Sequence, residues 1–335
     1  MSDPVLVEVT RGGIVESAHR GAFCVVDSAG KTVCALGDVA RPIFPRSSIK
    51  GFQALPLIET GAAARFSLTS AEIALACASH SGEPLHAATA ANVLKKAGLE
   101  PVCLECGAHW PMGDAATRAL AATGASPTAL HNNCSGKHAG FLCVAVEMGH
   151  DPKGYIAPGH PVMREITRAI SDMTGFDLEK TARGVDGCSI PTYAIPLDNI
   201  ARGFARFASG VGLGPERVKA VKTLREAVAA APFMVAGTGR FDTLIMEALG
   251  ARAFIKTGAE GVYCAALPEP GYGIALKMED GAGRAAESVM AGLIARFLPL
   301  NEAERAVITP WLDHQMTNWN GIEVGRLKVR HEVMQ

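Results

Sequence analysis

A serine and a lysine three residues apart are the first chemically useful feature of this sequence. They are Ser47 and Lys50 in the segment RSSIK, where strand-like residues give way to helix-like ones. On a helix the two side chains share one face, so a lysine amine without its proton can accept the hydrogen of the serine hydroxyl. Such a short pattern often arises by chance, and its ordinary explanation is a solvated serine and lysine. Other segments must therefore support a catalytic role.

Two later segments supply this support. ASHSG places Ser79 just after a predicted helix, and KTG, residues 256–258, ends a predicted strand. S-x-x-K, a second serine motif and K-T-G, in this order, are typical of the serine enzymes that recognise penicillin. The order favours acyl transfer, in which a serine attacks a carbonyl group, lysines hold protons, and backbone N–H groups, including one near Gly258, stabilise the oxyanion. The alternative for Lys256 is an ordinary lysine at a strand end.

The segment HNNCSGKH, residues 131–138, combines a thiol, an amine and an imidazole. A phosphate-binding loop requires G-x-x-x-x-G-K-[ST]. Here His131 occupies the first glycine position and His138 follows Lys137, so two required residues are absent. GTGRFD, residues 237–242, is a poor match to the G-x-G-x-x-G of dinucleotide-binding folds. The sequence therefore argues against a nucleotide-binding site.

The same segment fits a metal site better. If a helix begins just after Cys134, this thiol shares a face with both Lys137 and His138, as chelation by a first helical turn requires. Cys188, in a glycine-containing loop, is the best-placed further donor. The pair CLEC at 103–106 competes weakly, because it lacks a second half. The spacing leaves open whether the lysine or the histidine is the second ligand, and whether the thiols are only buried structural residues.

The elements that must position these residues are strands at both ends of the chain and helices between them. A hairpin through Ser28-Ala-Gly30 joins two of the strands. Alternating residues predict strands at 5–9, 22–27, 31–36, 251–256, 261–266 and 271–278. Periodicity and capping signals predict helices at 47–60 (broken near Pro56), 69–77, 84–97, 114–123, 135–148, 161–174, 198–209, 215–230, 241–249 and 284–297.

This order of elements predicts an α/β (α+β) fold in two parts. Residues 1–46 and 231–335 form a discontinuous domain with an antiparallel sheet sandwiched by helices. Residues 47–230 form an all-helical lobe. We expect the active site at the junction of the two domains.

Composition narrows the classes of function. The 335 residues are 48% hydrophobic and 19% charged with a net charge of −1, which argues against disorder and against a nucleic-acid partner. No apolar run reaches the ~18 residues of a membrane span, and the first residues lack the features of a signal peptide. The nine cysteines are scattered, as reduced thiols are. We expect a cytoplasmic protein that binds a small molecule and no membrane.

Five segments in order, RSSIKGFQALP, ASHSGEP, HNNCSGKHAGF, GVDGCSIPTYA and KTGAEGVY, resemble the class 3 (rhizobial-type) L-asparaginases of the asparaginase II family. The resemblance runs from about Val7 to the segment NWNGIEVGRL near the end of the chain. It implies a fold like that of serine β-lactamases and glutaminases, and a homodimer. It also implies hydrolysis of the side-chain amide of L-asparagine to L-aspartate and ammonia, without a nucleotide or organic cofactor.

The resemblance assigns roles residue by residue. It implies two catalytic pairs, Ser47 with Lys50 and Ser79 with Lys256, that converge on the scissile amide. We favour Ser47 as the covalent nucleophile, because a helix N-terminus lowers the cost of its alkoxide. The residues implied to bind or line the substrate are Arg46, His138, Asp186 and Gly258.

The resemblance also implies a zinc ion, held by Cys134, Lys137 and Cys188 with water completing its shell. Only the resemblance selects Lys137 over His138. A lysine must lose its proton to bind a metal, so we expect metal binding to weaken as the pH falls. Two thiolates reduce the acidity of zinc, which favours a role in positioning the substrate.

Two other functions remain as alternatives. The first is a glutaminase, a β-lactam hydrolase or another serine amidohydrolase on the same scaffold. Against β-lactams, the second motif is Ser79-His-Ser81, where penicillin-recognising enzymes have asparagine third. The second alternative is a zinc or thiol sensor whose function is the pair Cys134 and Cys188, with inert serine and lysine residues.

Overall fold

The computed structural model describes residues 2–335, and they form two compact units. The first contains the residues up to Ser48, Ile195–Val211 and Ile255–Gln335, and the second contains Ile49–Ala194 and Gly212–Phe254. The expected boundaries lay at 46/47 and 230/231. The division differs from them in three ways: residues 47–48 and the segment 195–211 belong with the sheet, and residues 231–254 belong with the helices.

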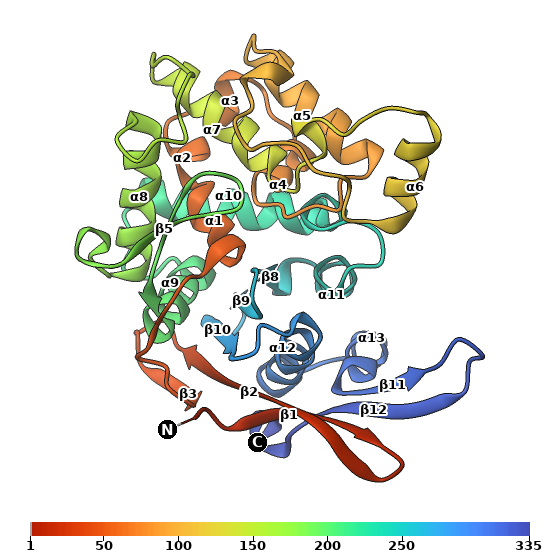
Figure 1. The fold of residues 1–335 in the computed structure, drawn as a ribbon. Helices are drawn as coiled ribbons and strands as arrows, with labels where there is room; N and C mark the ends of the chain where they lie inside the picture. The colour runs from red at the N-terminus through yellow and green to blue at the C-terminus, as the bar shows by residue number, and fades with distance from the viewer. Residues whose placement is uncertain (1) are drawn as a thin grey trace. The chain divides into compact units, whose positions relative to one another are not determined.

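The first unit is organised around one large sheet of eight strands. The strand order is β11-β12-β1-β2-β10-β9-β8, with β3 paired to β2, and the pairings from β11 through to β9 are antiparallel. The first and last strands of the chain therefore lie side by side, red and blue in Figure 1. The strands are β1 (Val5–Arg11), β2 (Ile14–Val26), β3 (Thr32–Leu36), β8 (Phe254–Thr257), β9 (Val262–Leu267), β10 (Tyr272–Met278), β11 (Asp313–Thr317) and β12 (Glu323–Val329).

Two helices cover the centre of this sheet. Helix α9 (Leu197–Ser209) packs on β2, β9 and β10, and α12 (Gly283–Phe297) packs on β1, β9, β10 and β12. Every residue of β9 is buried, which requires cover on both faces of that strand. A Cβ atom on Gly273 would lie 2.0 Å from the backbone nitrogen of Ala205, so only glycine permits the close approach of α9.

The remaining elements of the first unit lie outside the eight-stranded sheet. They are β4 (Pro42–Ile43), which pairs with β7 (Ile195–Pro196), η1 (Arg46–Ile49, which ends in the second unit), α13 (Glu302–Leu312) and α14 (His331–Met334).

The second unit is built around one buried helix, α7 (Ser135–Glu147), which packs on α2, α3, α4, α5 and α8. Its residues from Ser135 to Ala145 are all buried, as in a helix surrounded by others. The hairpin of β5 (Arg183–Val185) and β6 (Pro191–Tyr193) is the one sheet within this unit's described residues. The helices are α1 (Lys50–Gln53), α2 (Leu55–Glu59), α3 (Ala62–Arg65), α4 (Ser70–Ala76), α5 (Pro84–Lys96), η2 (Pro101–Cys103), α6 (Asp114–Ala122), η3 (Ala129–His131), α8 (Pro161–Thr174), η4 (Leu178–Lys180), α10 (Pro215–Ala230), η5 (Pro232–Val235), α11 (Phe241–Leu249) and η6 (Gly250–Arg252).

The expected fold class is confirmed: an antiparallel sheet with helices on both faces, and a largely helical second unit. The predicted spans of α8, α10 and α11 agree with the structure, and Thr69 and Glu72 form the predicted capping box of α4. The expected helix 47–60 is divided into η1, α1 and α2. Sequence reasoning missed β5, β6, β11, β12 and α13. None of the helices in residues 2–335 has the length and apolar character needed to cross a membrane.

Candidate active site

Lys50 is the centre of a buried polar cluster in the second unit. It is the first residue of α1, and its side chain is completely buried. Its Nζ lies 2.9 Å from Ser79 Oγ and 3.0 Å from Cys134 Sγ, and it also donates to the carbonyl oxygen of Ala78. Three acceptors match the three N–H bonds of an ammonium group. Lys50 must therefore give up one of these protons before it can act as a base.

Ser79 is held at this position by the end of α4. The helix stops at Ala76, and three residues later the backbone N–H of Ser79 donates to the carbonyl oxygen of Val235 at 2.9 Å. The serine is only 5% exposed. A separation of 2.9 Å between Ser79 Oγ and Lys50 Nζ lies within the range for direct proton transfer.

Two thiols approach each other beside this contact. Cys134 is the N-cap of α7, and Cys188 lies in the loop between β5 and β6. The hydrogen bond from Cys188 holds the pKa of Cys134 well below its ordinary value, and the charges of Lys137 and Lys50 act in the same direction against the effect of burial. The same hydrogen bond, together with burial, raises the pKa of Cys188. The hydrogen bond between them therefore favours the charged form of Cys134 over that of Cys188.

Lys137 completes this arrangement from the first turn of α7. Its Nζ donates to Cys188 Sγ at 3.0 Å. Burial lowers the pKa of Lys137, but the charges of Cys134 and Cys188, with that of Asp186, raise it by more. Lys137 Nζ therefore contacts the sulfur of Cys188 and is close enough to Cys134 for the charge of that residue to act on it.

The residues implied as zinc ligands therefore do come together. They offer two sulfur atoms and one nitrogen, and the low pKa of Cys134 suits a metal-binding thiolate. In donor chemistry the set fits a zinc ion once Lys137 and Cys188 lose their protons. Residues 2–335 contain no group of three or more His, Cys, Asp or Glu side chains that could hold a metal ion. The implied set is of another kind, because one of its donors is a lysine amine.

Two residues that the resemblance implies for substrate binding, His138 and Asp186, lie close in sequence to Lys137 and Cys188. His138 is completely buried, and its Nδ1 lies 2.5 Å from the hydroxyl oxygen of Tyr155. Burial, followed by the charges of Lys137 and Lys50, holds the pKa of His138 well below its ordinary value. Asp186 is half-buried in the same loop as Cys188.

A second group of implied residues comes together within the first unit. Lys256 is completely buried in β8, and a Cβ atom on Gly258 would lie 2.8 Å from the carbonyl oxygen of Pro45. The end of the K-T-G strand therefore packs against the segment that carries Ser47, which is half-buried in η1. Arg46 has a φ of +52°, in the left-handed region that non-glycine residues rarely adopt. Such strained residues cluster at functional sites.

The profile of the L-asparaginase II family matches residues 7–329. The chain belongs to the L-asparaginase II family. It is an enzyme, as the sequence predicted, and the match covers nearly the whole of this asparaginase.

Solved structures resemble this asparaginase only distantly. A mutant of simvastatin synthase from Aspergillus terreus has a TM-score of 0.43 and 10% identity, covering 87% of this chain and 90% of the other. A β-lactamase from Mycobacterium bovis has a TM-score of 0.35 and 13% identity, with coverage of 87% and 94%. A D-alanine carboxypeptidase from Burkholderia cenocepacia has a TM-score of 0.37 and 12% identity, with coverage of 87% and 92%. No curated protein sequence matches the chain.

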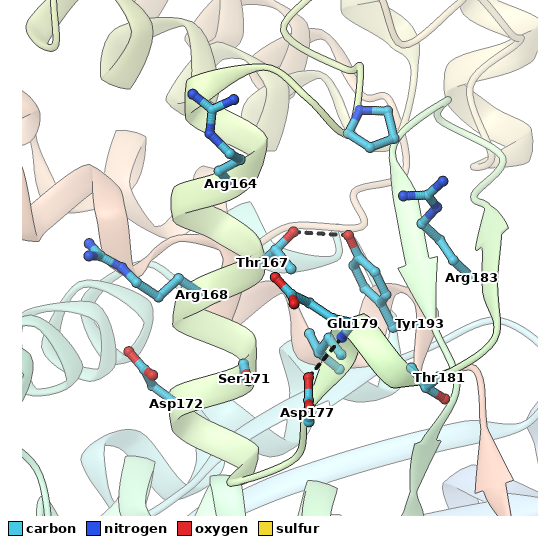
Figure 2. A pocket seen from close by; sticks show the side chains of 12 residues that line it. Arg164, Thr167, Arg168, Ser171, Asp172, Asp177, Glu179, Thr181, Arg183 and Tyr193 are labelled. Atoms are coloured by element: carbon cyan, nitrogen blue, oxygen red, sulfur yellow. Dashed lines mark hydrogen bonds between the residues drawn. The ribbon is translucent and has the colours of Figure 1, made fainter.

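A large pocket in the second unit of this asparaginase is lined by residues other than the predicted site residues. It has a volume of about 840 Å³ and is lined by residues of α8, η4 and the β5–β6 hairpin, none of them predicted site residues (Figure 2). Two of its arginines are already paired: Arg164 donates to the carbonyl oxygen of Gly159 at 2.5 Å, and Arg168 forms an ion pair with Glu165. We therefore do not place the chemistry there.

One hydrogen bond at this pocket nevertheless bears on the loop that carries Cys188. In Figure 2 the hydroxyl groups of Thr167 on α8 and Tyr193 on β6 face each other, and their oxygen atoms are 3.0 Å apart. This bond ties to α8 the hairpin whose loop carries Cys188.

Sequence reasoning missed two features of the site. The first is the contact of Lys50 with Ser79 and Cys134, because the residues are 29 and 84 positions apart. The second is Tyr155, which lies in a turn-rich segment without helical or strand periodicity. No local signal in the sequence could have found either of them.

Proposed function

We propose that this family member hydrolyses the side-chain amide of L-asparagine to L-aspartate and ammonia by serine–lysine catalysis beside a zinc ion. The family match supports the reaction. The observation that carries the serine–lysine part is the 2.9 Å contact between Lys50 Nζ and Ser79 Oγ in a buried site. A buried serine and lysine at this distance become an activated pair once the lysine loses its proton.

In each half of the reaction, one proton moves twice. Ser47, three residues before Lys50, is the hydroxyl that we propose attacks the amide carbon, while its proton passes to a lysine amine. When the carbon–nitrogen bond breaks, this proton is delivered to the leaving nitrogen and ammonia departs. Water then attacks the aspartyl ester, gives one proton to the amine, and releases L-aspartate. The amine returns that proton to the serine. Ser79, in contact with Lys50, serves as a relay for the proton.

The zinc ion belongs to the proposal through Cys134, Lys137 and Cys188. When bound, it would supply a weak Lewis acid and a fixed positive charge next to the substrate site. The residues themselves brace the start of α7 against the β5–β6 loop through the 3.0 Å contact of Lys137 with Cys188. Asp186 lies in that loop, so the same bracing positions its carboxylate.

Asparagine is a zwitterion with a neutral side-chain amide, so its site needs a cation for the carboxylate and an acceptor for the ammonium group. Arg46 and Asp186 are the residues that we propose for these roles. Glutamine is longer by one methylene, which displaces its amide by roughly 1 Å and can cost on the order of 10²-fold in rate. We therefore propose L-asparagine as the substrate and a glutaminase activity as minor.

Ammonia release from L-asparagine and L-glutamine by the purified protein tests this proposal. Ser47→Ala and Ser79→Ala should each abolish most of the activity, and an aspartyl ester trapped by mass spectrometry identifies the attacking serine. Ser81→Ala is the matched control, because the Ser81 hydroxyl is committed to the carbonyl oxygen of Ala236 at 2.9 Å. Full activity in both test variants would exclude serine–lysine catalysis. Activity that needs only zinc and the two cysteines would favour the sensor or another metal-dependent function.

We also propose a homodimer in the cytoplasm. The resemblance to the family supports the dimer, and nine free cysteines support a reducing compartment. Light scattering on the purified protein and fractionation of the source cells test the two parts separately.

A further inference from the structure

A pocket within the first unit borders the segment that leads to Ser47. It has a volume of about 600 Å³, and its lining residues include Phe44, Arg46, Glu260 and Lys277. This volume lies in the range of about 300–1,000 Å³ in which proteins hold drug-sized molecules. The pocket, which we call the Lys277 pocket, therefore has more room than L-asparagine alone would fill.

Two of the lining residues have a strained backbone. Arg46 has a φ of +52° and Glu260 a φ of +57°, and they are two of the four non-glycine residues with positive φ among residues 2–335. The carbonyl oxygen of Glu260 accepts a hydrogen bond from Lys277 Nζ at 2.6 Å, so the lysine of the pocket holds this strained turn. Strain of this kind persists where the surrounding structure fixes it, and it is concentrated at active sites and ligand clamps. The strain therefore favours a ligand in this pocket.

Lys277 supplies a cation to the pocket. Its Nζ donates to the carbonyl oxygens of Glu260 at 2.6 Å and Met278 at 2.5 Å. An ammonium group has three N–H bonds, so a third remains for a ligand. Burial, together with the charge of Arg41, lowers the pKa of Lys277 by more than the acidic neighbours raise it. Those neighbours therefore do not compensate for the burial of this charge, and a carboxylate on a ligand would stabilise it.

The other two cations of the pocket have different partners. Arg41 contacts Asp3 at 3.2 Å and Glu279 at 3.8 Å, so its charge is balanced within the first unit. Arg46 is the residue that we propose for the α-carboxylate of the substrate. Lys277 is therefore the cation that can take a second anionic group.

The pocket also adjoins both segments of the first unit that we assign to the reaction. Arg46 directly precedes Ser47, and Glu260 follows Gly258 by two residues. Consecutive Cα atoms are about 3.8 Å apart, and two residues of chain span at most about 7 Å. A group held by Arg46 therefore lies beside the free space of the pocket, on the side of the substrate that carries the α-carboxylate.

We propose that the Lys277 pocket binds the second residue of an asparaginyl dipeptide, so that this enzyme also deamidates asparagine at the first position of a short peptide. This inference rests on the proposed function and widens its substrate class. The peptide group replaces the α-carboxylate beside Arg46, Lys277 binds the carboxylate of the second residue, and Phe44 contacts its side chain. Phe44 is 41% exposed and offers an apolar surface for that contact.

The chemistry of the dipeptide reaction is that of the proposed asparagine reaction. The carbon–nitrogen bond of the side-chain amide breaks, the carbon gains the hydroxyl group of water, and the nitrogen leaves as ammonia with the remaining proton. The peptide bond stays intact. Asparaginyl-alanine therefore gives aspartyl-alanine and ammonia.

Two dipeptides of the same composition test the position of the pocket. We expect asparaginyl-alanine to be hydrolysed with a kcat/KM within about 10-fold of that for L-asparagine, because its side-chain amide keeps the same place. Alanyl-asparagine extends the substrate on the amino side instead, and it should react at least about 10-fold more slowly than asparaginyl-alanine. Mass spectrometry of the product, together with an ammonia assay, measures both. Equal rates for the two dipeptides would overturn the assignment of the pocket.

The role of Lys277 is tested by removing each partner of its contact. Wild type should bind asparaginyl-alanine with a KM about 10-fold below that of its C-terminal methylamide, which has no carboxylate. Lys277→Met should remove this difference, whereas Lys31→Met, at an exposed lysine of the same unit, should keep it. Equal KM values for the acid and the methylamide in wild type would overturn the role of Lys277, whether or not the variant folds.

Failure of this inference differs from failure of the proposed function. If L-asparagine releases ammonia but asparaginyl-alanine yields no aspartyl-alanine, the inference is overturned and the proposed function stands. If neither compound releases ammonia, the proposed function fails, and the inference fails with it.

Discussion

Lys50→Met is the substitution that tests the site most directly. Methionine has nearly the length of lysine, so it fills the buried space without an amine. Three partners lose their donor: the carbonyl oxygen of Ala78, the hydroxyl of Ser79 and the sulfur of Cys134. A positioned acid or base contributes about 10²- to 10⁴-fold to a reaction. We expect kcat/KM for L-asparagine to fall at least 100-fold, which corresponds to about 2.7 kcal/mol of transition-state stabilisation.

The same variant has a second effect at the thiols. The charge and hydrogen bond of Lys50 are among the causes that lower the pKa of Cys134, so their loss should raise that pKa. A thiol reagent small enough to enter should then react more slowly with Lys50→Met at neutral pH. The free energy of unfolding should change less than the activity. The substitution leaves three buried acceptors without a donor, which costs stability, but it also removes the cost of burying an ammonium group.

An ammonia assay and a reagent-labelling rate on the same preparation check both effects. Lys96→Met is the matched control. Lys96 lies on α5, not on α1, and its half-buried amine forms an ion pair with Glu72 at 2.7 Å. It should keep wild-type kcat/KM. If Lys50→Met retains wild-type kcat/KM while circular dichroism shows it folded, the serine–lysine argument is wrong.

Three further predictions concern metal binding and stability. Zinc affinity should rise about tenfold per pH unit for each proton that the metal displaces, because Lys137 has a raised pKa and must lose its proton to bind. Competition with a chelator at two pH values measures this rise. An affinity that does not change with pH would contradict Lys137 as a ligand. Burial raises the pKa of Glu72, but its hydrogen bonds to Lys96, Thr69 and Asn92 outweigh burial and hold the pKa below its ordinary 4.5. The bond to Lys96 therefore stabilises the fold above pH 4.5, and this stabilisation disappears as the pH falls through the lower pKa of the folded protein. The difference in Tm between wild type and Lys96→Met should therefore be present at pH 7 and vanish in acid; a difference independent of pH would refute it. Gly136→Ala should destabilise the protein by about 1–3 kcal/mol in urea unfolding, because its Cβ would lie 2.3 Å from a side-chain carbon of α4, whereas Gly140→Ala, at 3.3 Å from its neighbour, should cost less; equal costs would contradict this packing.

The sequence determined most of the local structure of this protein. Helices α8, α10 and α11 were predicted at the bounds that the structure gives them, because their signals are local: apolar periodicity, a proline at the start of α8 and α10, and a glycine after α8 and α11. The motif order, from S-x-x-K to K-T-G, predicts serine–lysine catalysis, and this stays a prediction. The β5–β6 hairpin and the strands near the end of the chain were missed, since β5 and β6 have three residues each and burial does not alternate along β11 and β12.

Only the tertiary structure decided the partners of the site residues. The sequence alone left Lys137 and His138 as equal candidates beside Cys134, and the fold separates them: Lys137 contacts Cys188, while His138 is bonded to Tyr155. Lys50 meets Ser79 and Cys134 for the same reason, because α4 packs directly on α7, and α1 packs on α2 and α8, which also contact α7. A residue's type and spacing set what it can do, whereas long-range packing sets the atoms within its reach.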